Sequence, residues 1–139
     1  MQRLLLLPII TLASLSLPGC SDGLPRRVLV TGKVSFQGQP LHTGTITFSP
    51  KVKGGTRPSV AYLREDGTFK MSTYRAEDGV RPGEYAVAII AYDEGPLSNA
   101  ANWSRTGKKL IPEKYFSHAT SGLTATIPNH DVQLEFKIE

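Results

Sequence analysis

The histidines and acids of this chain are spaced too widely to predict a metal site. None of His42, His118 and His130 has another histidine, a cysteine or an acid at the spacing that a zinc site requires. Asp93 and Glu94 are adjacent carboxylates, but no oxygen-rich spacing of the kind that holds calcium surrounds them. We therefore expect neither a metal ion nor another cofactor.

The residue types that perform catalysis are not arranged for it either. A Gly-x-Ser-x-Gly elbow and a glycine-rich phosphate loop are both absent from the 139 residues. The acids that a glycoside hydrolase would pair have no spacing that brings two of them together; they are Asp78, Glu84, Glu94 and Glu113. The sequence therefore predicts a protein that is not an enzyme.

Aromatic side chains outside the alternating strand patterns are the remaining candidates for a binding surface. They are Tyr74, Trp103, Tyr115 and Phe116. Loop aromatics on a β-sandwich can form a platform on which sugar rings stack, or a contact patch for a protein. They can also cap the open end of the sandwich. We expect capping, with Trp103 beside Tyr115, and keep ligand or partner binding as the alternative.

The N-terminal residues predict export. Arg3 precedes an uncharged, leucine-rich stretch over residues 4–17, which is too short to span a bilayer and is typical of a signal peptide. Leu17-Pro18-Gly19-Cys20 resembles a bacterial lipobox, although Pro18 departs from the small or β-branched residue that is usual there. Cys20 is the only cysteine in the chain, so a disulfide within the chain is excluded.

These signals predict a chain that is held to a membrane through fatty acyl chains, palmitate among them, on Cys20. We expect a signal peptide over residues 1–19, a linker over 20–26 and a folded domain over 27–139. The protein then lies in the cell envelope, in the periplasm or on the outer face of a membrane. Secretion without a lipid is the alternative.

The charge of the chain argues against nucleic acid as a partner. Loss of the signal peptide removes Arg3, which leaves 15 basic and 12 acidic residues and a net charge of +3. The basic residues are scattered, and no basic run is interleaved with aromatics. Pairs close to the anchor, such as Arg26-Arg27, can contact anionic lipid headgroups, but we expect them to be solvated.

Residues 82–92 are expected to form the central strand. Pro82-Gly83 breaks the preceding structure, and the residues from Tyr85 to Tyr92 are apolar on both alternating faces. A strand with one face in water alternates apolar with polar residues, so this strand is expected to be covered on both sides. A buried helix is the rival interpretation, which the β-branched and aromatic content disfavours.

Further segments have the pattern of short strands: residues 28–37, 45–48, 59–63, 68–73, 123–127 and 132–138. In the last of them, apolar residues alternate with polar ones, which predicts one face on the core and one in water. Asp66-Gly67 predicts a hairpin between 59–63 and 68–73. Its inward residues are expected to be Val60, Tyr62, Phe69 and Met71. Residues 111–115 are expected to form a short helical turn.

Seven short strands without an amphipathic helix predict one all-β domain, a sandwich of two sheets. A small closed barrel is the alternative. Residues 93–111 have no clean period. An irregular segment of this length in a compact domain is more often functional or mobile than structural, so we expect any specific function there.

Several short motifs carry a resemblance to a known family. They are Thr31-Gly32-Lys33-Val34, Gly38-Gln39-Pro40-Leu41, Gly44-Thr45-Ile46-Thr47-Phe48, Asp66-Gly67-Thr68-Phe69 and Pro82-Gly83-Glu84-Tyr85-Ala86-Val87. In this order they resemble carboxypeptidase-regulatory-like or transthyretin-like domains. Residues 111–115 with 120–124 are similar to the C-terminal part of short lipoproteins of planctomycete-type bacteria. The resemblance implies a prealbumin-like Greek-key sandwich of about seven strands and carries over no catalytic residue.

Together these features predict a non-catalytic, lipid-anchored module of the cell envelope that contacts other envelope proteins. A carbohydrate-binding accessory module that captures glycan is the alternative. The two are separated by whether the protein binds sugars.

Overall fold

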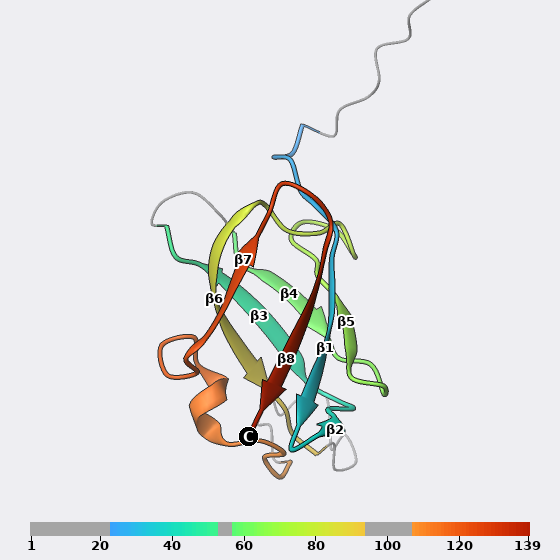
Figure 1. Ribbon diagram of the computed structural model, residues 1–139, viewed down its shortest axis with the longest axis vertical. Coiled ribbons are helices and arrows are strands. Elements are labelled where there is room, and N and C mark those ends of the chain that lie inside the picture. The colour runs from blue at the N-terminus through green and yellow to red at the C-terminus, as the bar shows by residue number, and fades with distance from the viewer. Residues whose placement is uncertain (1–22, 53–56, 94–106) are drawn as a thin grey trace, which may run out of the picture.

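The computed structural model describes residues 23–52, 57–93 and 107–139, which form two β-sheets packed face to face (Figure 1). The first sheet contains β1 (Val30–Phe36), β2 (Gln39–Pro40), β5 (Thr68–Lys70) and β8 (Val132–Ile138). The second contains, in spatial order, β4 (Ser59–Tyr62), β3 (Thr45–Pro50), β6 (Gly83–Ile90) and β7 (Leu123–Ile127). A 3₁₀ helix, η1 (Glu113–Phe116), precedes β7. Among the described residues, no helix has the length and apolar content needed to cross a membrane.

The predicted all-β sandwich is confirmed. Every strand expected from the sequence is present within a few residues, and β2 is an addition inside the expected turn after β1. β3, β4 and β5 follow one another, and β6 then returns to pair with β3, which is a Greek-key path. The last strand, β8, pairs in parallel with β1 along the full length of both.

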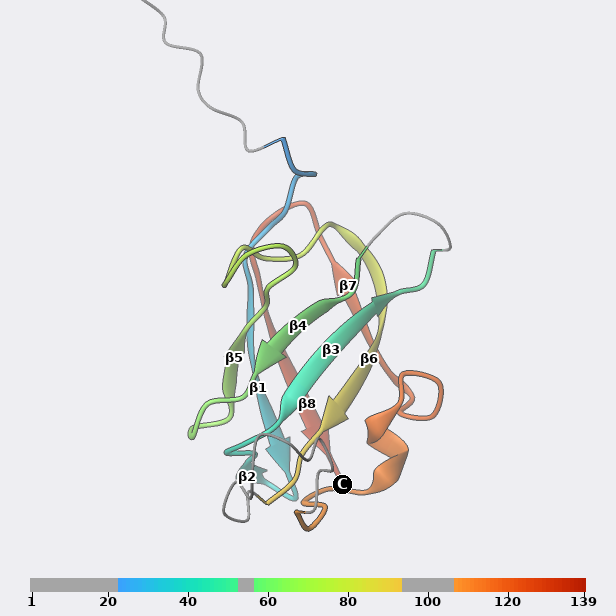
Figure 2. The ribbon, with the colours of Figure 1, turned by 180° about the vertical axis from the view of Figure 1, so that it is seen from behind.

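The strand directions give the sandwich two distinct ends (Figures 1 and 2). What we call the N-terminal end consists of the described segments 23–29, 51–52, 57–58, 71–82 and 128–131. The C-terminal end consists of the described segments 37–44, 63–67, 91–93, 107–122 and 139. The chain therefore enters the sandwich at one end and leaves it at the other.

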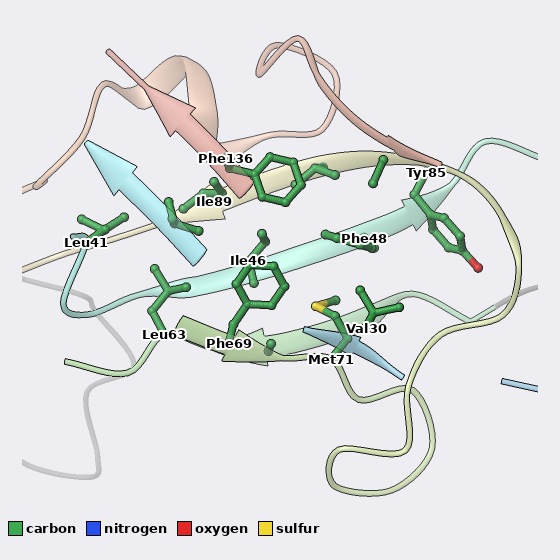
Figure 3. Close-up of a cluster of buried hydrophobic side chains, with 14 of the residues drawn as sticks. Val30, Leu41, Ile46, Phe48, Leu63, Phe69, Met71, Tyr85, Ile89 and Phe136 are labelled. Carbon is green, nitrogen blue, oxygen red and sulfur yellow. The ribbon is translucent and has the colours of Figure 1, made fainter. Parts of the chain in front are cut away.

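The core lies between the sheets and is built by alternation along each strand. Phe48, Phe69 and Phe136 meet in its centre, with ring centroids 6.1 Å apart for Phe48–Phe136 and 6.3 Å for Phe69–Phe136 (Figure 3). The expected alternation in β8 is confirmed: Phe136 and Ile138 are buried, and the intervening polar residues are exposed. Aromatic pairs at these separations add to the stability that burial provides.

Gly32 of β1 is required by this packing. A β-carbon at this position would lie 2.5 Å from the ring of Phe69 and 2.4 Å from the backbone oxygen of Leu134. The missing side chain therefore lets the Phe69 ring lie directly against β1.

The hairpin predicted at Asp66-Gly67 needs two corrections. The turn is present, with the Arg64 amide donating to the Thr68 carbonyl oxygen at 2.9 Å, but its arms β4 and β5 belong to different sheets. Val60 and Tyr62 were also expected inward, whereas Ala61 and Leu63 are buried and Tyr62 is 78% exposed. Both faces of this segment carry apolar residues, so side-chain hydrophobicity alone selects the wrong one.

The central strand β6 is covered on one face rather than on two. Val87 and Ile89 are fully buried, and Tyr85 nearly so, but Ala86 and Ile90 on the other face are only partly buried. Ala88 on that other face is 7% exposed but lies outside the core cluster. The physical reason is the number of layers: a sandwich of two sheets covers only the inner face of each. Ala86 and Ile90 thus belong to the surface of the protein.

Candidate functional site

The structure does not bring the four candidate aromatic residues together. Tyr74 lies in the segment between β5 and β6 at the N-terminal end, whereas Tyr115 and Phe116 lie in η1 at the C-terminal end. Trp103 lies outside the described residues, as does Cys20. Because the ends are separated by the length of the strands, Tyr74 and Tyr115 cannot form one stacking platform.

Tyr115 is held in the core at the C-terminal end. The residue is 6% exposed, and its hydroxyl donates to the backbone oxygen of Glu139 at 2.9 Å. The ammonium of Lys114 lies 4.8 Å from the centre of its ring. A buried ring cannot stack on a sugar, so these contacts favour a capping role for Tyr115.

Phe116 packs on the surface beside Tyr92, with ring centroids 5.2 Å apart. Lys109 lies over the Phe116 ring at 6.0 Å and pairs with Glu113, Nζ to Oε2, at 2.6 Å. The hydrogen bond that Lys109 donates to the Glu113 carboxylate raises the pKa of Lys109 above its ordinary value. This pair of rings is a small aromatic patch beside the ion pair of Lys109 and Glu113.

The ends of the segment 93–111 are joined by backbone hydrogen bonds. The Asp93 amide donates to the Lys108 oxygen at 2.7 Å, and the Leu110 amide donates to the Ala91 oxygen at 3.0 Å. Residues 94–106 lie outside the described residues, so the function expected there stays a prediction.

Tyr74 belongs to a polar network at the N-terminal end. Asp78 accepts hydrogen bonds from the amides of Thr73 at 2.7 Å and of Tyr74 at 3.2 Å. Its Oδ2 also lies 3.1 Å from Nε of Arg27, and both side chains of this ion pair are nearly buried, at 12% and 11% exposed. The Arg27 guanidinium lies over the Tyr74 ring at 5.4 Å. The ion pair and the ring contact hold Arg27, Asp78 and Tyr74 against one another, which indicates a structural role.

A metal-binding cluster is not found in the part of the chain that the structure describes. No three of its histidine, cysteine, aspartate and glutamate residues are close enough to hold a metal ion. A shallow groove of about 250 Å³ lies on the outer side of the first sheet, lined by Leu29, Val30, Thr31, Lys70, Met71 and Glu77. Glu77 at this groove is bound by Arg64 at 2.8 Å and Lys70 at 3.2 Å, so its carboxylate is occupied by cations.

The outer surface of the second sheet carries almost no charge. Its outward side chains, which follow from the strand register, are Thr45, Thr47, Ser49, Val60, Tyr62, Glu84, Ala86, Ala88, Ile90, Thr124 and Thr126. Only Glu84, at the start of β6, carries a charge. We call this surface the neutral face.

The outer surface of the first sheet provides the contrast. Its strands present Lys33, Lys70, Glu135 and Lys137 to solvent. The outer surfaces of both sheets face solvent, but only that of the first sheet carries several charged side chains.

Tyr62 stands at one corner of the neutral face. Its register partner on β3 is Thr45, and Thr45 in turn pairs with Ile90 on β6. The neutral face was not predicted from the sequence, because Tyr62 and Val60 were assigned to the core. The signal that could have found it is the hairpin register, since residues opposite each other in a hairpin share a face, and Phe69 inward requires Leu63 inward.

Comparison with known proteins adds little to this geometry. No protein-family model matches the chain, and no curated protein matches it. Among solved structures, a DUF3823 family protein from Parabacteroides merdae is similar at 16% sequence identity and a TM-score of 0.43. The match covers 81% of this chain and 45% of that chain, so this chain spans less than half the length of the matched structure.

Proposed function

We propose that this protein is a non-catalytic module of the cell envelope that binds another envelope protein through the neutral face. The observation that carries the proposal is the composition of this face: of eleven outward side chains on four strands, Glu84 alone is charged. Centres of protein interfaces are depleted of charged residues and enriched in tyrosine.

Tyr62 is the natural anchor of such an interface. Its side chain is 78% exposed in the free protein. Removal of an aromatic ring from water is favourable, so contact with a partner would be stabilised by covering this ring. Around it lie small and β-branched residues such as Thr45, Thr47 and Val60, which present a smooth surface because their side chains are short. A few aromatic anchors surrounded by near-neutral contacts are typical of binding surfaces.

The second part of the proposal is that Cys20 carries the lipid that holds this module to a membrane. The support is the leucine-rich stretch that precedes Leu17-Pro18-Gly19-Cys20. Two or more acyl chains anchor a protein stably, whereas a domain with a small net charge washes off. Cys20→Ser should therefore move the protein from the membrane fraction to a soluble fraction; retention on membranes through a high-salt wash would contradict the anchor.

We also infer that the module is related to carboxypeptidase-regulatory-like or transthyretin-like domains. The inference is supported by where the resembling motifs lie. Gly38 lies in the turn after β1 and Gln39–Pro40 form β2, Asp66-Gly67 lies in the turn between β4 and β5, and Pro82 immediately precedes β6.

A photo-cross-linker in place of Tyr62 tests the binding surface in cells. A matched probe replaces Lys33, which is exposed on the outer surface of the first sheet. We expect one defined envelope protein to be cross-linked from position 62 and not from position 33. The same adduct should disappear when Thr47→Lys is added. Equal cross-linking from both positions, or adducts that Thr47→Lys leaves unchanged, would show that the neutral face is not the contact.

One observation favours a carbohydrate as the second candidate ligand. The exposed Tyr62 ring lies on the same face as the hydroxyl groups of Thr45 and Thr47, and an aromatic ring beside hydrogen-bonding groups is suited to a sugar. A glycan array separates the two functions. A protein-binding module gives no signal, whereas a sugar-binding module gives a signal that Tyr62→Ala removes.

A further inference from the structure

We propose that the N-terminal end of the sandwich rests against the surface of a membrane that contains anionic phospholipids. The proposal deepens the proposed function, because it rests on the anchor at Cys20 and assigns the orientation in which the anchored domain is held. It departs from the expectation, drawn from the sequence alone, that the basic pairs near the anchor are merely solvated.

The described segments of the N-terminal end carry an excess of positive charge. They contain six basic residues, Arg26, Arg27, Lys51, Arg57, Arg75 and Arg81, against the acids Glu77, Asp78 and Asp131. The described segments of the C-terminal end contain four basic and five acidic residues. Basic residues that are far apart in the sequence, from Arg26 to Arg81, are thus gathered at one end by the segments between strands.

The acids of the N-terminal end leave most of this charge in place. Glu77 lies alongside β5 rather than at the tip of this end, because it is bound by Lys70 of β5 and by Arg64 of the C-terminal end. Asp78 pairs with Arg27 in the nearly buried network, and Asp131 accepts the Leu29 amide at 2.9 Å. Lys51 and Arg57, which lie in the segment between β3 and β4, are both exposed.

Exposed aliphatic side chains accompany the basic residues. Val52, next to Lys51, is 77% exposed, and Leu29, just before β1, is 53% exposed. Basic residues beside exposed aliphatic ones are the combination that binds the headgroup region of a bilayer, where the cations meet phosphate and the aliphatic groups leave water.

The path of the chain places this end close to the anchor. Val28 forms a β-bridge with Val80, and Arg26 donates to the Asn129 oxygen at 3.2 Å, so the N-terminal segment is fixed at this end as far as Arg26. Cys20 precedes Gly23, the first described residue, by only three positions. Six residues separate Cys20 from Arg26, the last residue fixed in this way, and they span about 22 Å at most when extended. This short tether lets the basic end approach the bilayer to within the Debye length of about 8 Å at physiological salt, where its charges meet the field of the headgroups.

Fluorescence quenching by headgroup-labelled lipids tests this orientation in the full acylated chain. The protein is reconstituted in phosphatidylcholine vesicles with or without phosphatidylglycerol, and carries one fluorophore on Val52→Cys or, as the matched control, on Glu65→Cys at the C-terminal end. We expect strong quenching at position 52, increased by phosphatidylglycerol, and none at position 65. Equal quenching at the two positions, or quenching that phosphatidylglycerol does not change, overturns the proposal. Absence of quenching at position 52 also overturns the proposal. An acidic protein would then be the alternative partner of the basic end.

Charge reversal sharpens the test. Lys51→Glu with Arg57→Glu should reduce the quenching in phosphatidylglycerol to the level in phosphatidylcholine, because each basic side chain strengthens contact with an anionic surface by about five-fold. Lys108→Glu, an exposed basic residue of the C-terminal end, should change nothing. An equal effect of Lys108→Glu would mean that net charge rather than orientation is measured.

The mass of the N-terminal peptide separates failure of the anchor from failure of the orientation. An acylated Cys20 without quenching at position 52 refutes the orientation alone. A peptide without acyl chains refutes the anchor, and co-flotation of that protein with phosphatidylglycerol vesicles then decides the remaining claim. If Lys51→Glu with Arg57→Glu abolishes this flotation, the basic end is supported as the lipid-binding surface. If the protein does not float with the vesicles, or floats equally well with these substitutions, the basic end is not that surface.

Discussion

Val60 and Ser72 exchange two backbone hydrogen bonds, 2.8 and 2.9 Å long, across the edge where the two sheets meet. This bridge joins β4 of one sheet to the chain that follows β5 of the other, and so closes that side of the sandwich. The register that it sets places Ala61 opposite Met71, both buried, and leaves Tyr62 outside. The corner of the neutral face is thus a consequence of how the sandwich is closed.

The core should depend strongly on β6. Ile89 is fully buried, so Ile89→Asp places a charge where it is not solvated and should lower the free energy of unfolding by about 3 kcal/mol or more. Glu135→Lys, on the exposed side of β8, should change it by about 0.5 kcal/mol or less. Urea unfolding measures both, and similar values would mean that the assignment of faces is wrong.

Tyr115 should contribute a hydrogen bond as well as a buried ring. Tyr115→Phe keeps the ring but removes the bond from its hydroxyl to the Glu139 oxygen, and should cost about 1 kcal/mol. Tyr62→Phe, at a ring that is 78% exposed, serves as the control and should leave the melting temperature unchanged. A Tyr115→Phe protein as stable as the parent would show that this cap does not need its hydroxyl.

Breaking the ion pair of Arg27 and Asp78 should destabilise the fold more than replacing both residues by apolar ones. Asp78→Ala leaves a nearly buried guanidinium without its partner and should destabilise the protein by about 3 kcal/mol. Replacing both residues by apolar ones, Arg27→Met with Asp78→Leu, should recover part of that loss. Thermal unfolding of the three proteins checks this order; a double variant less stable than Asp78→Ala would contradict it.

Asp66 should add a small pH dependence to stability. Hydrogen bonds from the Thr68 hydroxyl, at 2.6 Å, and from the Thr68 amide, at 3.0 Å, lower the pKa of Asp66 below its ordinary value. Because the pKa is lower in the folded state, this stabilisation is present above the unfolded pKa of about 3.9 and is lost as the pH falls through the folded pKa. Thr68→Val should raise the pKa of Asp66 in an NMR titration, and an unchanged midpoint would exclude the hydroxyl as the cause.

Most of the fold follows from local patterns in the sequence. The alternation in β8 and the Asp66-Gly67 turn are signals that depend on residues close together in the chain, and the structure has both. The faces of β4 could not be assigned in the same way. Val60 and Tyr62 are more hydrophobic than Ser59 and Ala61, and only pairing with β3 and the bridge to Ser72 decide which set faces the core.

The candidate sites were less predictable because they depend on distant residues. The loop aromatics Tyr74 and Tyr115 look alike in the sequence, but Tyr74 follows β5 and Tyr115 follows β6, and these two strands finish at opposite ends of the sandwich. The neutral face is made by four strands. The outward residues of any one of these strands do not distinguish it from an ordinary exposed strand. Its lack of charge becomes visible only when Thr47, Ala86 and Thr124 are placed on one surface by the sheet order.

The binding constant for the envelope protein cross-linked from position 62 tests the central claim most directly. Thr47→Lys puts a charge in the middle of the neutral face, and should weaken binding by about ten-fold or more, which corresponds to about 1.4 kcal/mol, without lowering the melting temperature. Gln133→Lys makes the same kind of change on the exposed side of β8 and should leave the binding constant unaltered. Equal weakening by the two variants, or none by Thr47→Lys, would contradict the neutral face as the binding surface.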